Sequence, residues 1–256
     1  MAGDGRNDLS IYDDMANKWW SDEIRWVRVL KNMVPGRLSW FDTHVDWRGK
    51  RVLDLGCAGG FMAEALTRRG ATVTGIDPAE KAIAAARAHA DETDLDISYD
   101  VGAGEEMPYP DASFDAVVCV DVLEHVRDLG QVLSEVTRVL VPGGTFLFDT
   151  INRNPVARLA AITMAEDVLR LLPKGTHDPA MFIRPGELRA ALKTAGLSPG
   201  PVTGLGPRGI DRRGDPVFGR LPTTAIIYMG IATKPAGAGS ESSRSEAALA
   251  ARGAQN

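Results

Sequence analysis

The sequence predicts an α/β fold built on a mostly parallel β-sheet that is covered by helices on both faces. From residue 51 onward, short apolar runs typical of buried strands alternate with segments of helical periodicity. The first of these runs leads directly into glycines, as a parallel strand does where it turns toward a helix. Repeated alternation of strand and helix favours a single sheet between two helical layers.

The composition indicates one substantial core with appendages, since 44% of the 256 residues are apolar and 25% are charged. A formal net charge of −5 gives no general attraction to nucleic acid, so no nucleic-acid partner is expected. The first residues lack the basic start and apolar block of a signal peptide, and no apolar run approaches the roughly 20 residues of a membrane span. Cys57 and Cys119 lie in apolar, strand-like contexts typical of reduced core thiols. We therefore expect a cytoplasmic protein.

Residues 1–46 are expected to form an N-terminal helical cap. The stretches "MANKWW", "EIRWVRVLKNM" and "RLSWF" place apolar side chains near helical spacing. Within this cap, Trp19 and Trp20 either join a hydrophobic core or wall the binding pocket.

Residues 47–150 are expected to form the central α/β core. Strands are predicted at "RVLDLGC", "ATVTGID", "ISYDVG", "FDAVVCV" and "GTFLFDT", and the helical run "FMAEALTRRG" has a plausible stop at Gly70. A further helix, "QVLSEVTRVL", places five apolar residues on one face: Val132, Leu133, Val136, Val139 and Leu140.

The remainder of the chain divides into three parts. Residues 151–183 are expected to form a lid insertion at the acceptor site, and residues 184–234 to complete the α/β domain, ending in the strand "TAIIYMGIATK". Residues 235–256 are small and polar, a composition that predicts a disordered tail.

The glycine turn "RVLDLGCAGGF" raises the question of which nucleotide it binds. The dinucleotide fingerprint requires glycine, any residue, glycine, two residues, and then glycine or alanine. Counted from Gly56, the second glycine position is Ala58 and the last is Phe61, where close helix–strand packing requires a very small side chain. The turn therefore does not match a dinucleotide site.

The motifs around the glycines resemble those of class I S-adenosylmethionine-dependent methyltransferases. "VLDLGCAGG", "GIDPAE", "FDAVVCVDVLEH" and "LVPGGTFLF" carry this resemblance over residues 51–150. It implies a Rossmann-like, doubly wound sheet of seven mostly parallel strands and S-adenosyl-L-methionine as the cofactor. Gly56 and Gly59 then leave room for the aminoacyl portion of the cofactor. Asp77, at the end of its strand, accepts hydrogen bonds from both ribose hydroxyls, or caps the helix that follows.

Two further cofactor positions are open to alternatives. Asp54 either binds the amides of the loop or contacts the cofactor amine through water. Many related enzymes carry an acid after the third strand for the adenine amino group, whereas "VGAGEEMP" has Ala103 there. Either Glu105 or backbone carbonyls are left to meet the adenine.

Motifs outside the core narrow the resemblance to the ubiquinone-biosynthesis O-methyltransferases. They are "NKWW", "GRLSWF", "TINRN", "LPKGTHDPAMFIRPGEL" and "IIYMGIATK", and the similarity extends over roughly residues 10–234. The resemblance implies methylation of a phenolic or catecholic hydroxyl on an aromatic small molecule, quinol-like or hydroxybenzoate-like. It also implies cofactor-binding roles for Arg37 and Val120. In the cofactor-binding role, Arg37 would pair with the carboxylate of the methionine moiety. The alternative is that Arg37 is an exposed charge on a helix.

Methyl transfer to a phenol requires a base or a cation, because a phenol has a pKa near 10. Asp121, Glu124 and His125 in "DVLEHV" follow the fourth strand, and in metal-dependent members of the family these positions hold a divalent ion such as Mg, Mn or Zn. In members without metal, the glutamate caps loop amides and the histidine lines the pocket. Without a metal ion, His125 is the first candidate for the catalytic base, and His177 is the second. The alternative for His177 is a structural role in which it stabilises its loop.

The insertion and the assembly allow further alternatives. The apolar face of the insertion carries basic residues, but Glu166 and Asp167 dilute them, so we expect a lid helix with weak or absent membrane contact. The sequence leaves the oligomeric state open, a homodimer included. Alternative functions are C- or N-methylation of a secondary metabolite and a non-catalytic cofactor-binding partner.

Overall fold

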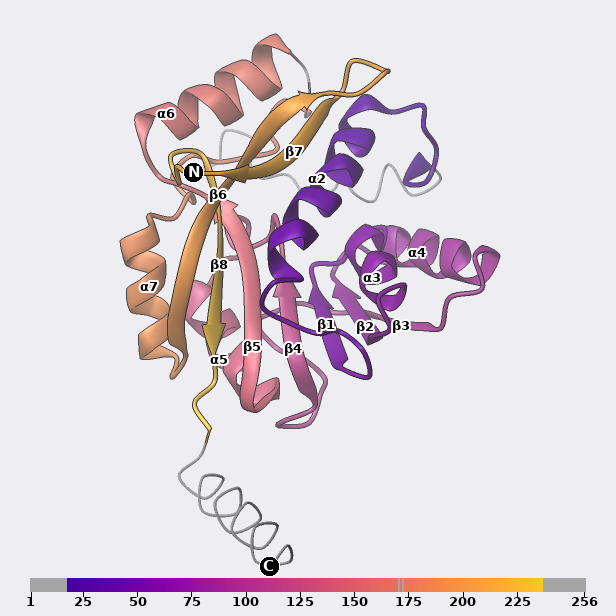
Figure 1. The fold of residues 1–256 in the computed structure, drawn as a ribbon, viewed down its shortest axis with the longest axis vertical. Coiled ribbons are helices and arrows are strands. Elements are labelled where there is room, and N and C mark those ends of the chain that lie inside the picture. Colours follow the sequence, from indigo (N-terminus) through magenta and orange to yellow (C-terminus); the bar gives the residue numbers. More distant parts are fainter. Residues whose placement is uncertain (1–17, 170, 172, 237–256) are drawn as a thin grey trace, which may run out of the picture.

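The computed structural model describes residues 18–169, 171 and 173–236 (Figure 1). Its α-helices are α2 (Arg25–Phe41), α3 (Phe61–Thr67), α4 (Glu80–Glu92), α5 (Leu129–Val139), α6 (Pro155–Arg158) and α7 (Pro185–Thr194), and a π-helix, η2 (Leu159–Val168), continues α6. Its strands are β1 (Arg51–Leu55), β2 (Thr72–Asp77), β3 (Ile97–Val101), β4 (Phe114–Cys119), β5 (Leu140–Ile151), β6 (Ser198–Ile210), β7 (Pro216–Leu221) and β8 (Ile227–Thr233).

The strands form one sheet in the order β3-β2-β1-β4-β5-β8-β6-β7. The pairs from β3 to β5 are parallel, whereas β8 pairs antiparallel with β5 and β6, and β7 pairs antiparallel with β6. The predicted doubly wound α/β fold is confirmed, but the prediction of seven strands is wrong, because the sheet has eight. The hairpin of β6 and β7 is rich in glycine and proline and lacks the apolar alternation that reveals a strand.

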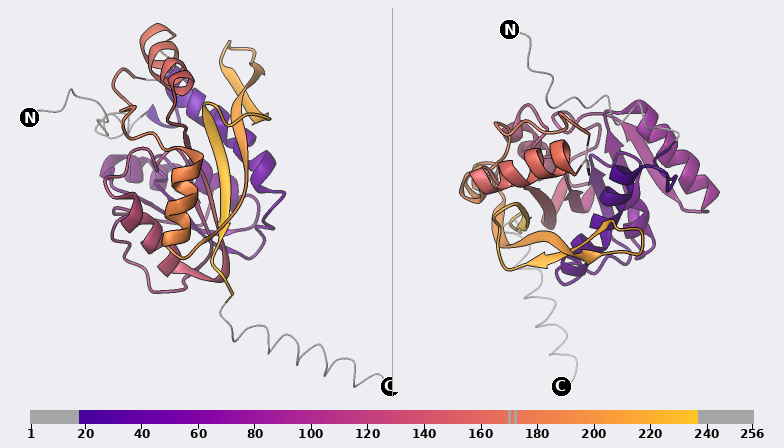
Figure 2. Two further views of the ribbon diagram at one scale, coloured as in Figure 1. Left: turned by 90° about the vertical axis from the view of Figure 1, so that its left-hand side faces the viewer. Right: turned by 90° about the horizontal axis from the view of Figure 1, so that it is seen from above.

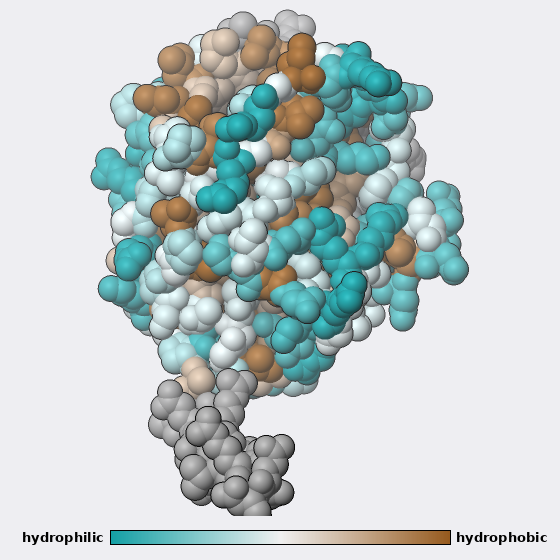
Figure 3. All heavy atoms as spheres, in the orientation of Figure 1, coloured by the Kyte–Doolittle hydropathy of each residue, from teal (hydrophilic) through white to brown (hydrophobic). Residues whose placement is uncertain are grey.

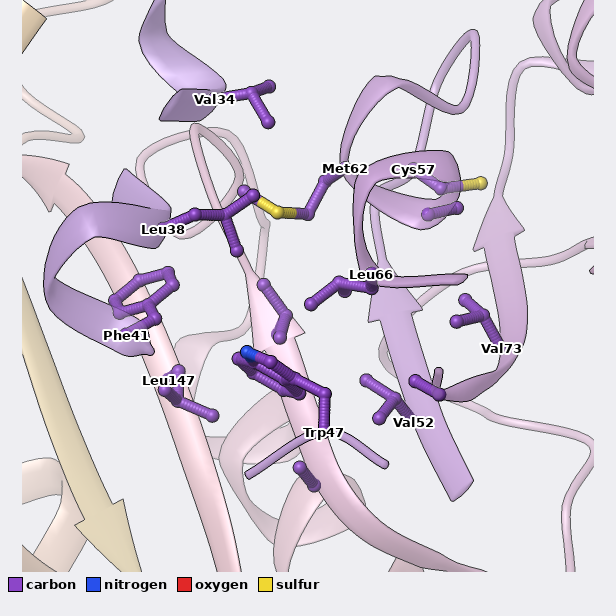
Figure 4. Packing of buried hydrophobic residues seen from close by; sticks show 14 of the residues in the cluster. Val34, Leu38, Phe41, Trp47, Val52, Cys57, Met62, Leu66, Val73 and Leu147 are labelled. Atoms are coloured by element: carbon purple, nitrogen blue, oxygen red, sulfur yellow. The ribbon is translucent and has the colours of Figure 1, made fainter. Parts of the chain in front are cut away.

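Alternate residues of the parallel strands supply two hydrophobic cores, one on each face of the sheet. Val52 of β1 packs with α2, α3 and α4 on one face, and Figure 4 shows it beside Trp47, Leu66 and Val73. Leu53, the next residue of β1, packs with α5 and α7 on the other face. The sheet is therefore buried on both sides, which explains the near-continuous apolar runs of its parallel strands.

Two local predictions for the core are confirmed. Gly70 follows α3 with φ +90°, a conformation that suits glycine at a helix end. The helix predicted within residues 131–140 is α5, and Asp128 caps it by accepting a hydrogen bond from the Gln131 N–H at 3.0 Å. The four helical residues of the predicted apolar face are completely buried, and the fifth, Leu140, begins β5.

The carboxyl ends of the parallel strands lie together at one edge of the sheet. The α6–η2 segment follows β5 directly at this edge, and the turn between β6 and β7 projects at the same end (Figures 1 and 2). Within the N-terminal region, α2 packs against α3 and β7. Residues 1–17 of the predicted cap and 237–256 of the predicted tail lie outside the described residues. Among those described, no helix has the length and apolar character needed to cross a membrane.

A glycine in α2 sets how closely this helix approaches β7. A Cβ at Gly36 would lie 2.7 Å from the carbonyl oxygen of Phe218. Helix propensity alone makes Gly→Ala favourable by about 1 kcal/mol. We predict that Gly36→Ala nevertheless lowers the melting temperature, because the helix must move away from a backbone carbonyl. Thermal unfolding measures this.

Gly186 in α7 is the matched control, because a Cβ there meets no atom within 4 Å. Gly186→Ala should leave the melting temperature unchanged or raise it. Equal shifts in the two variants would show that the contact of α2 with β7 does not constrain the helix.

Candidate functional site

A cavity of about 680 Å³ lies at the carboxyl ends of β1, β2 and β4. This volume is within the range of roughly 300–1,000 Å³ that is usual for small-molecule sites. The cavity lies where the sheet order reverses between β1 and β4, the position at which doubly wound folds bind their ligands. All seven residues that the sequence assigns to the cofactor line its wall, namely Arg37, Asp54, Gly56, Gly59, Asp77, Glu105 and Val120.

The glycines after β1 make room for protein side chains. Gly56 has φ +75°, and a Cβ there would lie 2.2 Å from a methyl group of Val122. A Cβ at Gly59 would lie 2.6 Å from the ring of Trp19. The sequence interpretation explained these glycines by the approach of the cofactor. The contacts show that packing of Val122 and Trp19 against the loop already requires them.

The two tryptophans hold the glycine loop from the N-terminal side. Trp19 is buried and lines the cavity. Trp20 donates a hydrogen bond from Nε1 to the Gly59 carbonyl oxygen at 2.9 Å, and its ring stacks on His89 with centroids 3.5 Å apart. Of the two predicted roles, Trp19 thus has both, since it packs against the glycine loop and forms part of the cavity wall.

Asp77 connects the glycine loop to the start of α4. Its Oδ2 accepts from the Ala58 N–H at 2.9 Å, and its Oδ1 accepts from the Ala79 N–H at 2.8 Å. Ala58 has φ 43°, which is uncommon for a residue other than glycine, so this hydrogen bond helps to stabilise the turn. A carboxylate accepts several hydrogen bonds, so these amides leave the ribose role compatible with the structure.

Asp54 is a buried carboxyl group in the cavity wall. Within the described chain, neither of its oxygens has a hydrogen-bond partner of ordinary geometry. Burial raises the pKa of Asp54 to about 7, against a smaller opposing effect of the Ala63 amide, and the nearby Asp77 adds to the increase. A buried acid with so little hydrogen bonding is a suitable site for a cationic group. The cavity therefore suits the ammonium group of S-adenosylmethionine, which Asp54 would bind, with Asp77 at the ribose.

Glu105 and Ala103 lie together in the wall of the cavity, as the adenine assignment requires. An Oε1 atom of Glu105 accepts from the Arg127 N–H at 3.3 Å. The structure thus keeps both predicted options, the carboxylate and the backbone, at this end of the cavity.

Arg37 is a buried residue of α2, and the alternative of an exposed helix charge is wrong. Its Nε donates to Asp149 Oδ2 at 2.6 Å, and its Nη2 forms an ion pair with Asp121 Oδ2. Burial lowers the pKa of Arg37, but the two carboxylates outweigh burial and raise it. Arg37 therefore stays charged and joins α2 to the ends of β4 and β5.

The metal-ligand set predicted from the sequence needs a correction. Asp121 forms an ion pair with Arg37 and does not join Glu124 and His125. Among the described residues, the group that could hold a metal ion is Glu124, His125 and His177, each with one ligand atom within 4.8 Å of the others. Adjacency in "DVLEHV" suggested a shared site, but Asp121 has φ 54° and its carboxylate points toward α2.

Glu166 is a buried residue that contacts a candidate site residue, and the sequence interpretation missed this contact. It was counted as a surface charge that dilutes a basic face, whereas the structure buries it. Its carboxylate accepts from the Gly175 N–H at 2.9 Å, the His177 N–H at 3.1 Å and the His177 ring Nδ1 at 2.9 Å. Burial raises the pKa of Glu166, but these hydrogen bonds outweigh burial and lower it. The sequence shows only an acid on a short amphipathic segment. The contact of Glu166 with the loop that carries His177 becomes visible only in the tertiary structure.

The cluster of Glu124, His125 and His177 contains groups with altered pKa values. Burial, reinforced by the nearby His177, lowers the pKa of His125 to about 3, so His125 is neutral at physiological pH. The two imidazole rings lie stacked with centroids 5.2 Å apart. Burial, reinforced by Asp121 and Asp149, raises the pKa of Glu124 to about 8. His125 lines the cavity, which connects the cluster to the cofactor site.

The chain is similar to known methyltransferases in sequence and in fold. Residues 53–148 match the family described as a methyltransferase domain. A ubiquinone biosynthesis O-methyltransferase of Pseudomonas entomophila is 43% identical over 209 residues, covering 80% of this chain and 88% of that protein, and the enzyme of the same name from Pseudomonas fluorescens gives the same values. A methyltransferase structure from Thermotoga maritima has a TM-score of 0.62 at 18% identity, covering 89% of this chain and all of that one. One from Aquifex aeolicus has a TM-score of 0.58 at 17% identity, covering 82% and 98%. These structures support the fold.

The assignment of Asp77 to the cofactor ribose predicts that a substitution of Asp77 weakens cofactor binding. Asp77→Ala removes the acceptor for two ribose hydroxyls and the two amide contacts that order the loop. We expect the affinity for S-adenosylmethionine to fall by roughly 1–3 kcal/mol, measured by calorimetry. Wild-type affinity in a folded Asp77→Ala protein would contradict the assignment.

The buried acid predicts how stability depends on pH. In the folded protein Asp54 has a pKa of about 7, against an ordinary value of 3.8, so the folded state binds the extra proton between these values. Asp54 should therefore lower the free energy of unfolding as pH rises from about 4 to 7, by up to roughly 4 kcal/mol. Asp54→Asn has no such proton and should lose this slope. Urea unfolding of both ligand-free proteins at pH 5 and pH 8 measures the difference, and parallel slopes would contradict it.

Proposed function

The chain belongs to the ubiquinone biosynthesis O-methyltransferases, and on that basis we propose that it methylates a hydroxyl oxygen of a phenolic or catecholic, quinol-like small molecule. The protein is an S-adenosylmethionine-dependent methyltransferase. The observation that carries the proposed chemistry is the buried cluster of Glu124, His125 and His177, which adjoins the cofactor cavity through His125. Of the two alternative functions, C- or N-methylation and a non-catalytic partner, neither matches the names of these relatives.

The reaction places two demands on the chain. S-adenosylmethionine supplies a methyl group on a sulfonium, and transfer requires the acceptor oxygen to lie in line with the carbon–sulfur bond. The acceptor hydroxyl must also lose its proton, since a phenol with a pKa near 10 is protonated at neutral pH. The wall of the cavity orients the acceptor, and the buried cluster provides the groups that remove the proton.

We assign the proton transfer to the imidazoles of the cluster. His125 is neutral and lines the cavity, so a ring nitrogen can accept a proton, but a pKa of about 3 makes it a weak base whose positive charge must be stabilised by its neighbours. Because ionised Glu166 can only accept a hydrogen bond, Nδ1 of His177 carries the proton in that contact. Glu166 would also stabilise positive charge that develops on the two stacked rings.

The same three residues also suit a divalent cation. Glu124 Oε1 is buried and has no hydrogen-bond partner among the described residues, and a neutral His125 is in the form that binds metal. Glu124, His125 and His177 would hold the cation, which would lower the pKa of an acceptor hydroxyl. Two imidazoles and one carboxylate favour Mn or Zn over Mg, which prefers oxygen ligands.

The remaining assignments concern compartment and partners. Cytoplasmic location is supported by two buried, unbridged thiols, Cys57 and Cys119. Weak or absent membrane contact stays a prediction, and so do the absence of a nucleic-acid partner and the oligomeric state.

Apolar side chains of the α6–η2 segment are exposed, among them Val156, Leu159 and Met164. Figure 3 shows hydrophobic residues gathered at this end of the molecule, where an apolar acceptor would enter.

Chelation separates the two ways in which the cluster can act. If a cation is needed, chelator treatment should abolish methylation of a catechol while S-adenosylmethionine still binds, and added Mn, Zn or Mg should restore turnover. If the imidazoles act alone, chelation should have no effect. In both cases His125→Ala should lower kcat by roughly 10²–10⁴. Transfer of a labelled methyl group measures turnover.

His44 provides the control, because it is an exposed histidine that packs edge-on against Trp40 away from the cavity. His44→Gln should retain wild-type turnover. Near-normal turnover of His125→Ala, combined with indifference to chelator, would refute both roles of the cluster.

A further inference from the structure

Asp121 has an unusual backbone conformation at a point where the cavity wall depends on it. Its φ is 54°, in the left-handed region that residues other than glycine rarely adopt. Such a conformation is strained for a residue with a side chain and persists only when surrounding contacts impose it. Val120 and Asp121 both line the cavity directly after β4, so the shape of this turn is part of the site.

One buried acid outside the cavity wall imposes this conformation. Asp149 of β5 is completely buried and is not among the wall residues. Its Oδ1 accepts from the Asp121 N–H at 2.7 Å, and its Oδ2 accepts from Arg37 Nε at 2.6 Å. Arg37 in turn pairs with the Asp121 carboxylate, so the backbone and the side chain of Asp121 are bound by the same buried group of charges.

The order of the strands indicates which part of the cofactor lies at this turn. With the ribose at Asp77, the end of β2, the adenine lies toward β3, beside Ala103 and Glu105. The opposite end of the cofactor must then lie toward β1 and β4, which are next in the sheet. That end carries the amino-acid group, and the wall there consists of Asp54, Val120 and Asp121 with Arg37.

We propose that Asp149 is a positioning residue for the amino-acid end of the cofactor, acting through Arg37 and the left-handed turn at Asp121. This inference rests on the proposed placement of the ribose at Asp77. Asp149 touches neither cofactor nor acceptor. It holds Arg37 and Asp121 in the arrangement that forms one end of the cavity, and no part of the adenosine depends on it.

The test compares two ligands that differ at that end alone. S-adenosylhomocysteine has the amino-acid group, whereas 5′-methylthioadenosine keeps the adenosine and the thioether sulfur without it. Asp149→Asn retains the size of the side chain but removes the charge that binds Arg37. Calorimetry should show Kd for S-adenosylhomocysteine raised roughly tenfold or more, with Kd for methylthioadenosine within about twofold of wild type.

Asp215→Asn is the matched control. Asp215 is also a buried aspartate that binds arginines of α2, with Arg25 Nε at 3.1 Å and Arg28 Nε at 2.6 Å, but it is not part of the cavity wall. Its loss should lower the melting temperature and leave both Kd values unchanged. If Asp149→Asn does not fold, Asp149→Ser serves instead, because its shorter side chain cannot reach both the Asp121 N–H and Arg37.

Three results would overturn the proposal: an equal loss of both ligands in the folded Asp149 variant, unchanged binding of both, or the same selective loss in Asp215→Asn. The Asp77→Ala variant tests the ribose placement separately from the role of Asp149. If the ribose lies at Asp77, this variant should bind both ligands more weakly. Unchanged binding in Asp77→Ala would refute the ribose placement, whereas the ratio of the two Kd values in Asp149→Asn reports on the amino-acid end alone.

Discussion

The functional site depends on one constraint, the parallel arrangement of β3, β2, β1, β4 and β5. Parallel strands end at the same edge, so residues far apart in sequence meet there. Asp54, Asp77 and Asp121 belong to three such strand ends, and Asp149 to a fourth. The sheet is packed on both faces, and the residues after its strand ends line the cavity.

Burial of acidic groups is the electrostatic consequence of this arrangement. Burial raises the pKa of Asp54 to about 7, of Asp149 to about 6, where Arg37 opposes the increase, and of Glu124 to about 8. Each of these carboxyl groups would be more stable in water, so the fold tolerates them at a cost in stability. Enzymes commonly concentrate such groups where a cationic ligand or a proton must be received. Here the ligand carries both an ammonium group and a sulfonium.

The α6–η2 segment links the acceptor side of the site to the rest of the fold. It leaves the sheet at the end of β5, and Glu166 returns to bind the loop that carries His177. Three hydrogen bonds to one carboxylate position both the backbone and the ring of that histidine. Glu166 therefore connects the α6–η2 segment to the loop that carries one of the proposed proton-transfer groups.

The local pattern was sufficient for the fold class and for the ends of the parallel strands, and the resemblance of the motifs to methyltransferases indicated the cofactor. Apolar runs and glycine turns report on burial and backbone conformation, which depend on near neighbours, so the strand ends could be located from them. The family resemblance of the motifs supplied cofactor assignments such as Arg37 and Val120, and all seven assigned residues line the cavity. The hairpin of β6 and β7 was not predicted, because its glycines and prolines conceal the periodicity of a strand. The ion-pair partners of the charged side chains were not predicted either, for a different reason. Arg37 with Asp149, Asp121 away from Glu124, and Glu166 with His177 are contacts between distant segments, and only the packed sheet and helices decide which carboxylate each of them meets.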